Sequence, residues 1–205
     1  MSNLELRKNQ EGIRSSLEAY IRPYLESKLF HGGKPIDVER LVSGQCRLKI
    51  SEVSEQSRNA LTDIVLRKVF LWAKRLGPVD PQATGPDKYR LFIVLDEAQI
   101  FLTSNQNARA CVAKYASEAR KYGIGLVLAT QLFENVPQDV RGNIDAKLFM
   151  LCLDETEARK NARSAGLSKE EISKLKKGQG YYISSGDRYA RRVQINPPWI
   201  SKKKI

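Results

Sequence analysis

Residues 91–97, LFIVLDE, decide the fold class, because five apolar residues are followed at once by two acidic ones. Two further apolar runs occur later in the chain, GIGLVLATQ at 123–131 and KLFMLCL at 147–153. Continuous apolar runs of this length predict strands that are buried on both faces, as in a parallel sheet. Helical patterns separate the runs, so we expect crossover connections and a three-layer α/β domain.

The segments around these runs complete the expected order of elements. Apolar periodicity predicts helices at 4–30, 56–76, 107–122, 155–165 and 168–176. Alternation and turn residues predict a short strand at CRLKI (46–50). They also predict a strand pair, GYYIS (180–184) and YARRVQI (189–195), with a turn at Ser185-Gly186-Asp187. We expect the inward face of the helix at 56–76 to carry Leu61, Ile64, Val65, Val69, Trp72 and Leu76. The predicted division is a helical segment at 1–35, an α/β domain at 36–197 and a basic tail at 198–205.

Composition limits the class of protein. The chain has 205 residues, of which 41% are hydrophobic and 28% charged, as in globular domains. No apolar run approaches the ~18 residues of a membrane span, and the polar start MSNLELRKNQEG is not a secretory signal. We therefore expect a cytoplasmic protein without membrane insertion. Cys46, Cys111 and Cys152 are far apart, which favours buried free thiols over disulfides or a metal site.

The net charge of +12 predicts a polyanionic partner, with nucleic acid ahead of an anionic membrane surface. Basic residues are concentrated near the C-terminus, where they are candidates for phosphate contacts: Arg188, Arg191, Arg192, Lys202, Lys203 and Lys204. The alternative for the last three lysines is a tail that only aids solubility.

The acidic pair after the first apolar run suits phosphoryl transfer. Ligands of open parallel sheets bind at the carboxyl ends of the strands. There Asp96 can hold Mg²⁺ through water, and Glu97 can accept the proton of an attacking water. The alternative is that both acids cap the following helix, since acids favour a helix N-terminus.

The second run ends in Thr130 and Gln131. A glutamine at the tip of the adjacent strand can hydrogen-bond a γ-phosphate or orient the water. The alternative is that both residues only satisfy backbone groups at the end of the strand.

Three blocks of sequence resemble the HerA/FtsK superfamily of hexameric ATPases: LFIVLDEAQIFL, EARKYG (118–123) leading into LVLATQ, and LKKGQGYYIS. The resemblance covers roughly residues 40–197, and Gln99 stands where many relatives have His. It implies a RecA-like (ASCE) core in a ring-forming homo-oligomer that uses ATP and Mg²⁺ to translocate or unwind DNA.

The resemblance also implies roles for single residues. Asp96 would serve Mg²⁺, Glu97 would be the general base, and Thr130 and Gln131 would lie at the nucleotide, with Gln131 as its sensor. Arg120 and Arg141 are the candidates for an arginine finger that reaches a neighbour's ATP. The alternative for Arg120 is a solvated cation at a helix C-terminus.

These 205 residues contain no Gly-x-x-x-x-Gly-Lys-Ser/Thr motif. His31-Gly32-Gly33-Lys34-Pro35 does not replace it, because Pro follows the lysine and no Ser or Thr is there to meet Mg²⁺. In the resembled fold the P-loop strand lies between the strands expected at 124–130 and 147–153. That strand could come from another polypeptide, the two flanking strands could pair directly, or the chain could be part of a split or truncated ATPase.

We therefore expect an ATP hydrolase when a P-loop is supplied by another segment or chain, and no activity from this chain alone. Two alternatives remain open. One is an inactive ATPase-like module for DNA binding or oligomerisation. The other is a relative of the conjugation or secretion ATPases.

Overall fold

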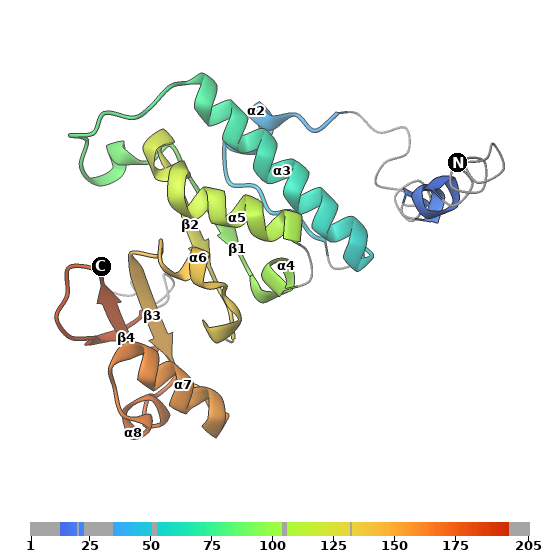
Figure 1. Cartoon of the computed structure of the whole chain (residues 1–205). Coiled ribbons are helices and arrows are strands. Elements are labelled where there is room, and N and C mark those ends of the chain that lie inside the picture. Colours follow the sequence, from blue (N-terminus) through green and yellow to red (C-terminus); the bar gives the residue numbers. More distant parts are fainter. Residues whose placement is uncertain are drawn as a thin grey trace, which may run out of the picture. The chain divides into compact units, whose positions relative to one another are not determined.

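The computed structural model describes residues 13–19, 21–22, 35–50, 53–103, 106–131 and 133–196 (Figure 1). Residues 13–19 and 21–22 are helical, as predicted for this part of the segment 4–30. The rest of that segment, residues 31–34 and the tail with Lys202, Lys203 and Lys204 lie outside the described residues. The chain forms two compact units, one drawn from 1–93 and 104–126 and the other from 94–103 and 127–205.

The first unit is mainly helical. Its elements are α2 (Val38–Val42), α3 (Glu55–Arg75), η2 (Gly85–Lys88), α5 (Gln106–Glu118), η3 (Ala119–Tyr122) and the beginnings of β1 (Leu91–Leu95) and β2 (Ile124–Leu128). The α3 helix begins at Ser54, whose side chain accepts a hydrogen bond from the amide of Ser57. Lys74 and Arg75 lie in its last turn, where cations complement the helix dipole.

The core of this unit is the interface between α3 and α5, which run side by side in Figure 1. Buried residues recur at helical spacing on both: Leu66, Val69, Phe70 and Ala73 on α3, and Cys111, Val112 and Tyr115 on α5, with Ala119 following at the start of η3. The Tyr115 ring lies 5.2 Å from that of Phe70, and its hydroxyl donates to the carbonyl of Leu66. Burial raises the pKa of this phenol, so Tyr115 stays a neutral donor.

The β1 and β2 strands are parallel. The amide of Arg90 donates to the Gly123 carbonyl at 2.7 Å and the amide of Ala129 to the Leu95 carbonyl at 2.9 Å, so both strands advance in the same direction. The Phe92 ring lies over Gly125, where a Cβ atom would come within 2.3 Å of a ring carbon. Glycine is therefore needed at position 125 to admit the ring.

The second unit is built on an antiparallel sheet of β3 (Ala146–Met150), β4 (Gln179–Ser184) and β5 (Arg191–Gln194). Its helices are α4 (Gln99–Thr103), η4 (Phe133–Asn135), α6 (Gln138–Arg141), α7 (Glu155–Ala165) and α8 (Lys169–Ser173). One face of the sheet packs on α7 and α8 through a buried cluster of Phe149, Ala158, Ala162, Ala165, Ile172 and Leu175. A capping box between Ser168 and Glu171 fixes the start of α8.

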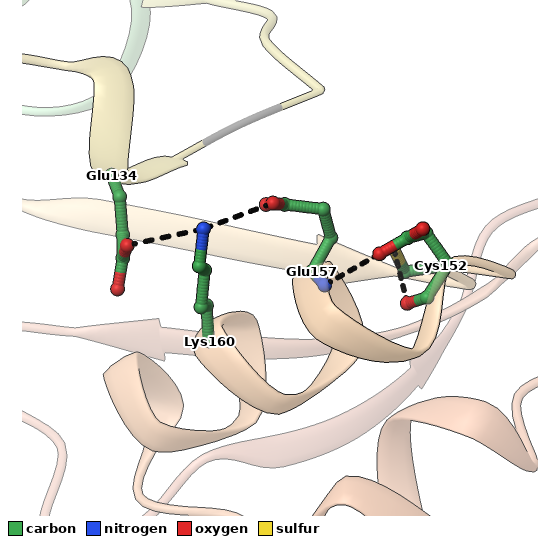
Figure 2. Close-up of polar contacts among 5 residues, drawn as sticks. Glu134, Cys152, Glu157 and Lys160 are labelled. Atoms are coloured by element: carbon green, nitrogen blue, oxygen red, sulfur yellow. Dashed lines mark hydrogen bonds and ion pairs between the residues drawn. The ribbon is translucent and has the colours of Figure 1, made fainter.

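The short helix η4 contacts both this cluster and α7, and Figure 2 shows its ion pair with α7. The Phe133 ring meets that of Phe149 edge-on at 5.8 Å, and Lys160 on α7 lies between Glu134 at 3.6 Å and Glu157 at 3.1 Å. The pKa of Lys160 is raised, chiefly by its hydrogen bond to Glu157. These contacts hold η4, which begins two residues beyond Gln131.

The predicted α/β class is confirmed, as are the strand at 91–95, the helix at 155–165 and the C-terminal strand pair. The expectation of a mostly parallel sheet is wrong for β3. Two helices, and not a single crossover helix, lie between β3 and β4. They return the chain to Gly180, beside Met150 at the end of β3, so β4 runs antiparallel to β3. The described ladders are therefore one parallel and two antiparallel pairs.

Three other expectations fail. Residues 46–50 form no strand and are largely exposed. Cys46 is therefore exposed and not buried as predicted. Cys111 is buried, and its burial raises the pKa of the thiol to about 11. The side of β1 that carries Phe92 (59% exposed) and Val94 (62% exposed) is largely open to solvent, and not buried as predicted. The buried face of α3 is rotated from the predicted one, so that Leu76 is exposed.

Candidate functional site

The two acidic residues after β1 lie in a turn whose ends are both fixed by one residue of the neighbouring strand segment. The amide of Ala129 donates to the carbonyl of Leu95, and the carbonyl of Ala129 accepts from the amide of Ala98, each at 2.9 Å. Asp96 and Glu97 are thus held between two backbone bonds to a single residue. Because Ala98 is fully buried, this turn is anchored and not a free loop.

Glu97 has a backbone φ of +50°, the only positive φ at a non-glycine residue in the described part of the chain. The left-handed region is uncommon for residues with a Cβ, and holding a side chain there costs about 1–3 kcal/mol. Such strained residues concentrate at active sites and ligand clamps. The conformation directs the Glu97 side chain to a place that regular strand geometry would not give it.

The carboxylate of Glu97 is held by two amide side chains. Gln131, which follows β2, donates from Nε2 to Glu97 Oε1 at 2.9 Å, and Gln99 donates from its Nε2 to Glu97 Oε2. The structure therefore joins the two strand tips that the sequence singled out. It adds Gln99, which the sequence showed only as a departure from the related pattern, and which lies two residues beyond Glu97 at the start of α4.

Asp96 is exposed, and its Oδ1 accepts from the amide of Glu97 at 3.0 Å. This bond supports the turn, and α4 begins only at Gln99. Within the described residues no other contact to the Asp96 carboxylate is found, so it is open to solvent. Thr130 is half-buried beside Gln131.

A metal cage made only of protein ligands is absent from the part of the chain that the structure describes, since no three His, Cys, Asp or Glu residues cluster there. Mg²⁺ commonly uses one or two carboxylates together with water and substrate phosphates. An exposed Asp96 at a strand tip fits that second mode.

The two candidate finger arginines lie in different surroundings. Arg141 ends α6, its guanidinium carbon is 5.7 Å from the centre of the Phe133 ring, and its Nε is buried without a hydrogen-bond partner among the described residues. Arg120 is exposed in η3 of the first unit. No described contact joins Arg141 to Glu97, which lies in the same unit.

The described C-terminal arginines lie on the β4–β5 hairpin. Arg188 is exposed in the connecting loop, Arg191 pairs with Asp187 at 2.9 Å, and Arg192 donates to the Gln179 side chain at 2.9 Å.

Comparison with protein-family models gives no match. The chain is 22% identical over 153 residues to the DNA double-strand break repair helicase HerA of Saccharolobus solfataricus, covering 71% of this chain and 30% of that protein. It is 21% identical over 204 residues to HerA of Sulfurisphaera tokodaii, covering 96% of this chain and 40% of that protein.

Solved structures share the fold. The genome packaging NTPase B204 of Sulfolobus turreted icosahedral virus 2, in complex with sulfate, aligns with a TM-score of 0.56 at 16% identity, over 84% of this chain and 78% of B204. VirB4 of Thermoanaerobacter pseudethanolicus aligns with a TM-score of 0.55 at 17% identity, over 75% of this chain and 41% of VirB4. Together these findings support a HerA/FtsK superfamily relationship.

Because the identities to these solved structures are low, the likeness to them concerns the fold alone. The chain spans about a third of the length of the curated HerA relatives that it matches. None of the helices in the described residues is long and apolar enough to cross a lipid bilayer.

Proposed function

We propose that this chain contributes part of the nucleotide site of an ATP-driven DNA translocase or helicase of the HerA/FtsK kind. The observation that carries the proposal is the hydrogen bond between Gln131 and Glu97 at the tips of two parallel strands. It places a carboxylate and an amide from different strands at the edge of the sheet where open α/β folds bind ligands. The relationship to HerA helicases supports the same assignment.

In the proposed reaction Glu97 accepts the proton of the attacking water, and Gln131 orients that carboxylate and senses the γ-phosphate. Gln99 holds the second carboxylate oxygen, so the side chain is positioned before substrate arrives. Asp96 binds Mg²⁺ through water, with Thr130 beside the nucleotide. Bound ATP supplies the phosphoryl group, and Mg²⁺ neutralises its developing charge.

We propose further that the P-loop is supplied by another segment or another chain. A site without it lacks the backbone amides and the lysine that cradle the phosphates. In the part of the chain that the structure describes, β2 pairs with β1, and β3 pairs with β4. Leu148 and Met150 on β3 are also exposed, which leaves apolar surface for an added element to cover.

The proposed partners are DNA and further copies of the chain in a ring, with Arg141 or Arg120 reaching a neighbour's ATP. The net charge of +12 supports a polyanionic partner.

The proposal is tested by measuring ATP turnover of this chain together with the P-loop-bearing polypeptide, with and without duplex DNA. We expect DNA to raise turnover, and the stimulation to fall steeply between about 50 and 200 mM salt, because phosphate contacts release counterions. Turnover that is the same when this chain is omitted would contradict the proposal. So would a response to DNA that does not depend on salt.

A second candidate function is an ATPase-like module that binds DNA or promotes oligomerisation without catalysis. The absence of the P-loop motif from these 205 residues favours it. The same measurement separates the two, because such a module binds DNA but leaves the turnover of the mixture unchanged.

A further inference from the structure

The loop between β4 and β5, residues 185–190, presents an aromatic side chain to solvent. Tyr189 is 75% exposed. Large aromatic side chains usually bury most of their surface, so a ring presented in this way is available to a partner.

This loop is ordered by its own hydrogen bonds. The Asp187 carboxylate accepts from the Ser184 amide at 2.9 Å and from the Ser184 hydroxyl at 2.7 Å, and the Ser185 amide donates to the Asp145 carbonyl at 2.9 Å. The hydrogen bonds from Ser184, and to a lesser degree the charge of Arg191, lower the pKa of Asp187, so its carboxylate is ionised at neutral pH. Because the loop is already ordered, binding of a partner at Tyr189 costs little conformational entropy in the loop.

Two arginines flank Tyr189 in the sequence. Arg188 is exposed and has no ion-pair partner among the described residues. Arg191 is held by Asp187 at 2.9 Å and lies 5.7 Å from the centre of the Tyr182 ring. Tyr182 pairs with Arg191 in the sheet, on the face opposite to Tyr181 and Ile183, which pack against the helical cluster. Two tyrosines and two arginines thus belong to the loop end of one hairpin.

We propose that this hairpin binds single-stranded nucleic acid, with one base stacked on Tyr189 and the adjacent phosphates on Arg188 and Arg191. Exposed aromatic rings interleaved with cations are what sequence-tolerant single-strand binding requires, because every base has a π-face. Single strands suit the ring better than a duplex, in which neighbouring base pairs cover those faces. The proposal goes beyond the nucleotide site and requires neither ATP nor a P-loop.

The test is fluorescence anisotropy of a labelled 15-nucleotide oligo-dT with the full chain, in about 50 mM salt and without nucleotide. Tyr189→Ala is expected to weaken binding about tenfold, whereas Tyr189→Trp retains it, since stacking is lost only in the first. Arg188→Ala is expected to weaken binding and to lower the salt slope by about one. Arg163→Ala is the matched control, because Arg163 is an exposed arginine on α7 away from the loop.

Three results with the single strand would overturn the proposal, and a fourth comes from a duplex. The first is that the parent chain does not bind the oligonucleotide, and the second is that Tyr189→Ala leaves the affinity unchanged. The third is that Arg188→Ala and Arg163→Ala lose the same affinity, which would indicate only diffuse charge attraction. A blunt duplex of the same length provides the last comparison. If Tyr189→Ala weakened duplex binding as much as single-strand binding, stacking on an unpaired base would be wrong. Because nucleotide is absent, these outcomes are independent of the ATPase proposal.

Discussion

Glu97→Gln is expected to lower ATP turnover by about 10²–10⁴-fold in the assembly that includes the P-loop, because the amide cannot accept the proton of the attacking water. The substitution keeps the size of the side chain, and the anchored turn fixes its backbone through Ala98 and Ala129. Binding of ATP should therefore remain close to that of the parent protein. Initial rates at saturating ATP, together with equilibrium binding, measure the two effects separately.

Glu134→Gln is the control for this experiment. Glu134 is an exposed carboxylate three residues beyond Gln131 and is paired with Lys160. The same chemical change there should leave turnover within about twofold. If Glu97→Gln behaved like Glu134→Gln, Glu97 would not be the general base.

Tyr115→Ala is expected to lower the free energy of unfolding by about 3–5 kcal/mol, the range for removing a large buried aromatic side chain. Tyr115 is almost fully buried between α3 and α5, contacts Phe70, and bonds the Leu66 carbonyl. Since whole domains are stable by about 5–15 kcal/mol, the variant should be marginally folded. Urea denaturation followed by far-ultraviolet circular dichroism measures the change.

Tyr115→Phe separates packing from the hydrogen bond. It keeps the ring and loses only the donor to Leu66, so a cost of about 1 kcal/mol is expected. If Tyr115→Ala cost no more than Tyr115→Phe, the α3–α5 interface would not be the core of this unit.

Local patterns predicted the elements well. The run LFIVL gave β1 at its observed bounds, and the turn at Ser185-Gly186-Asp187 gave the hairpin, because both depend on residues close in sequence. The buried face of α3 was harder to predict, since apolar residues such as Leu71 and Leu76 extend around most of the helix. Only the position of α5 decides which of them are covered.

The antiparallel pairing of β3 with β4 was not accessible from the sequence either. It depends on where two successive helices, α7 and α8, return the chain, because no short turn connects β3 to β4.

At the candidate site, the sequence predicted which residues lie at the strand tips but not how they contact one another. Asp96, Glu97 and Gln131 stood out because polar residues follow apolar runs. The hydrogen bond from Gln99 and the positive φ of Glu97 depend on the turn between Leu95 and Ala98. Turn rules would place Gly or Asn at a positive φ, so a glutamate in that conformation carries no local signal.

The most direct test of the central claim is equilibrium binding of Mg·ATP to residues 1–205 alone and to the same residues joined to, or mixed with, the P-loop-bearing segment. Isothermal titration calorimetry should show no measurable binding by the chain alone. Binding should appear in the completed site and weaken when Asp96 is replaced by Asn. Tight binding by the chain alone, or binding in the completed site that ignores Asp96→Asn, would contradict the assignment of these strand tips to one half of a nucleotide site.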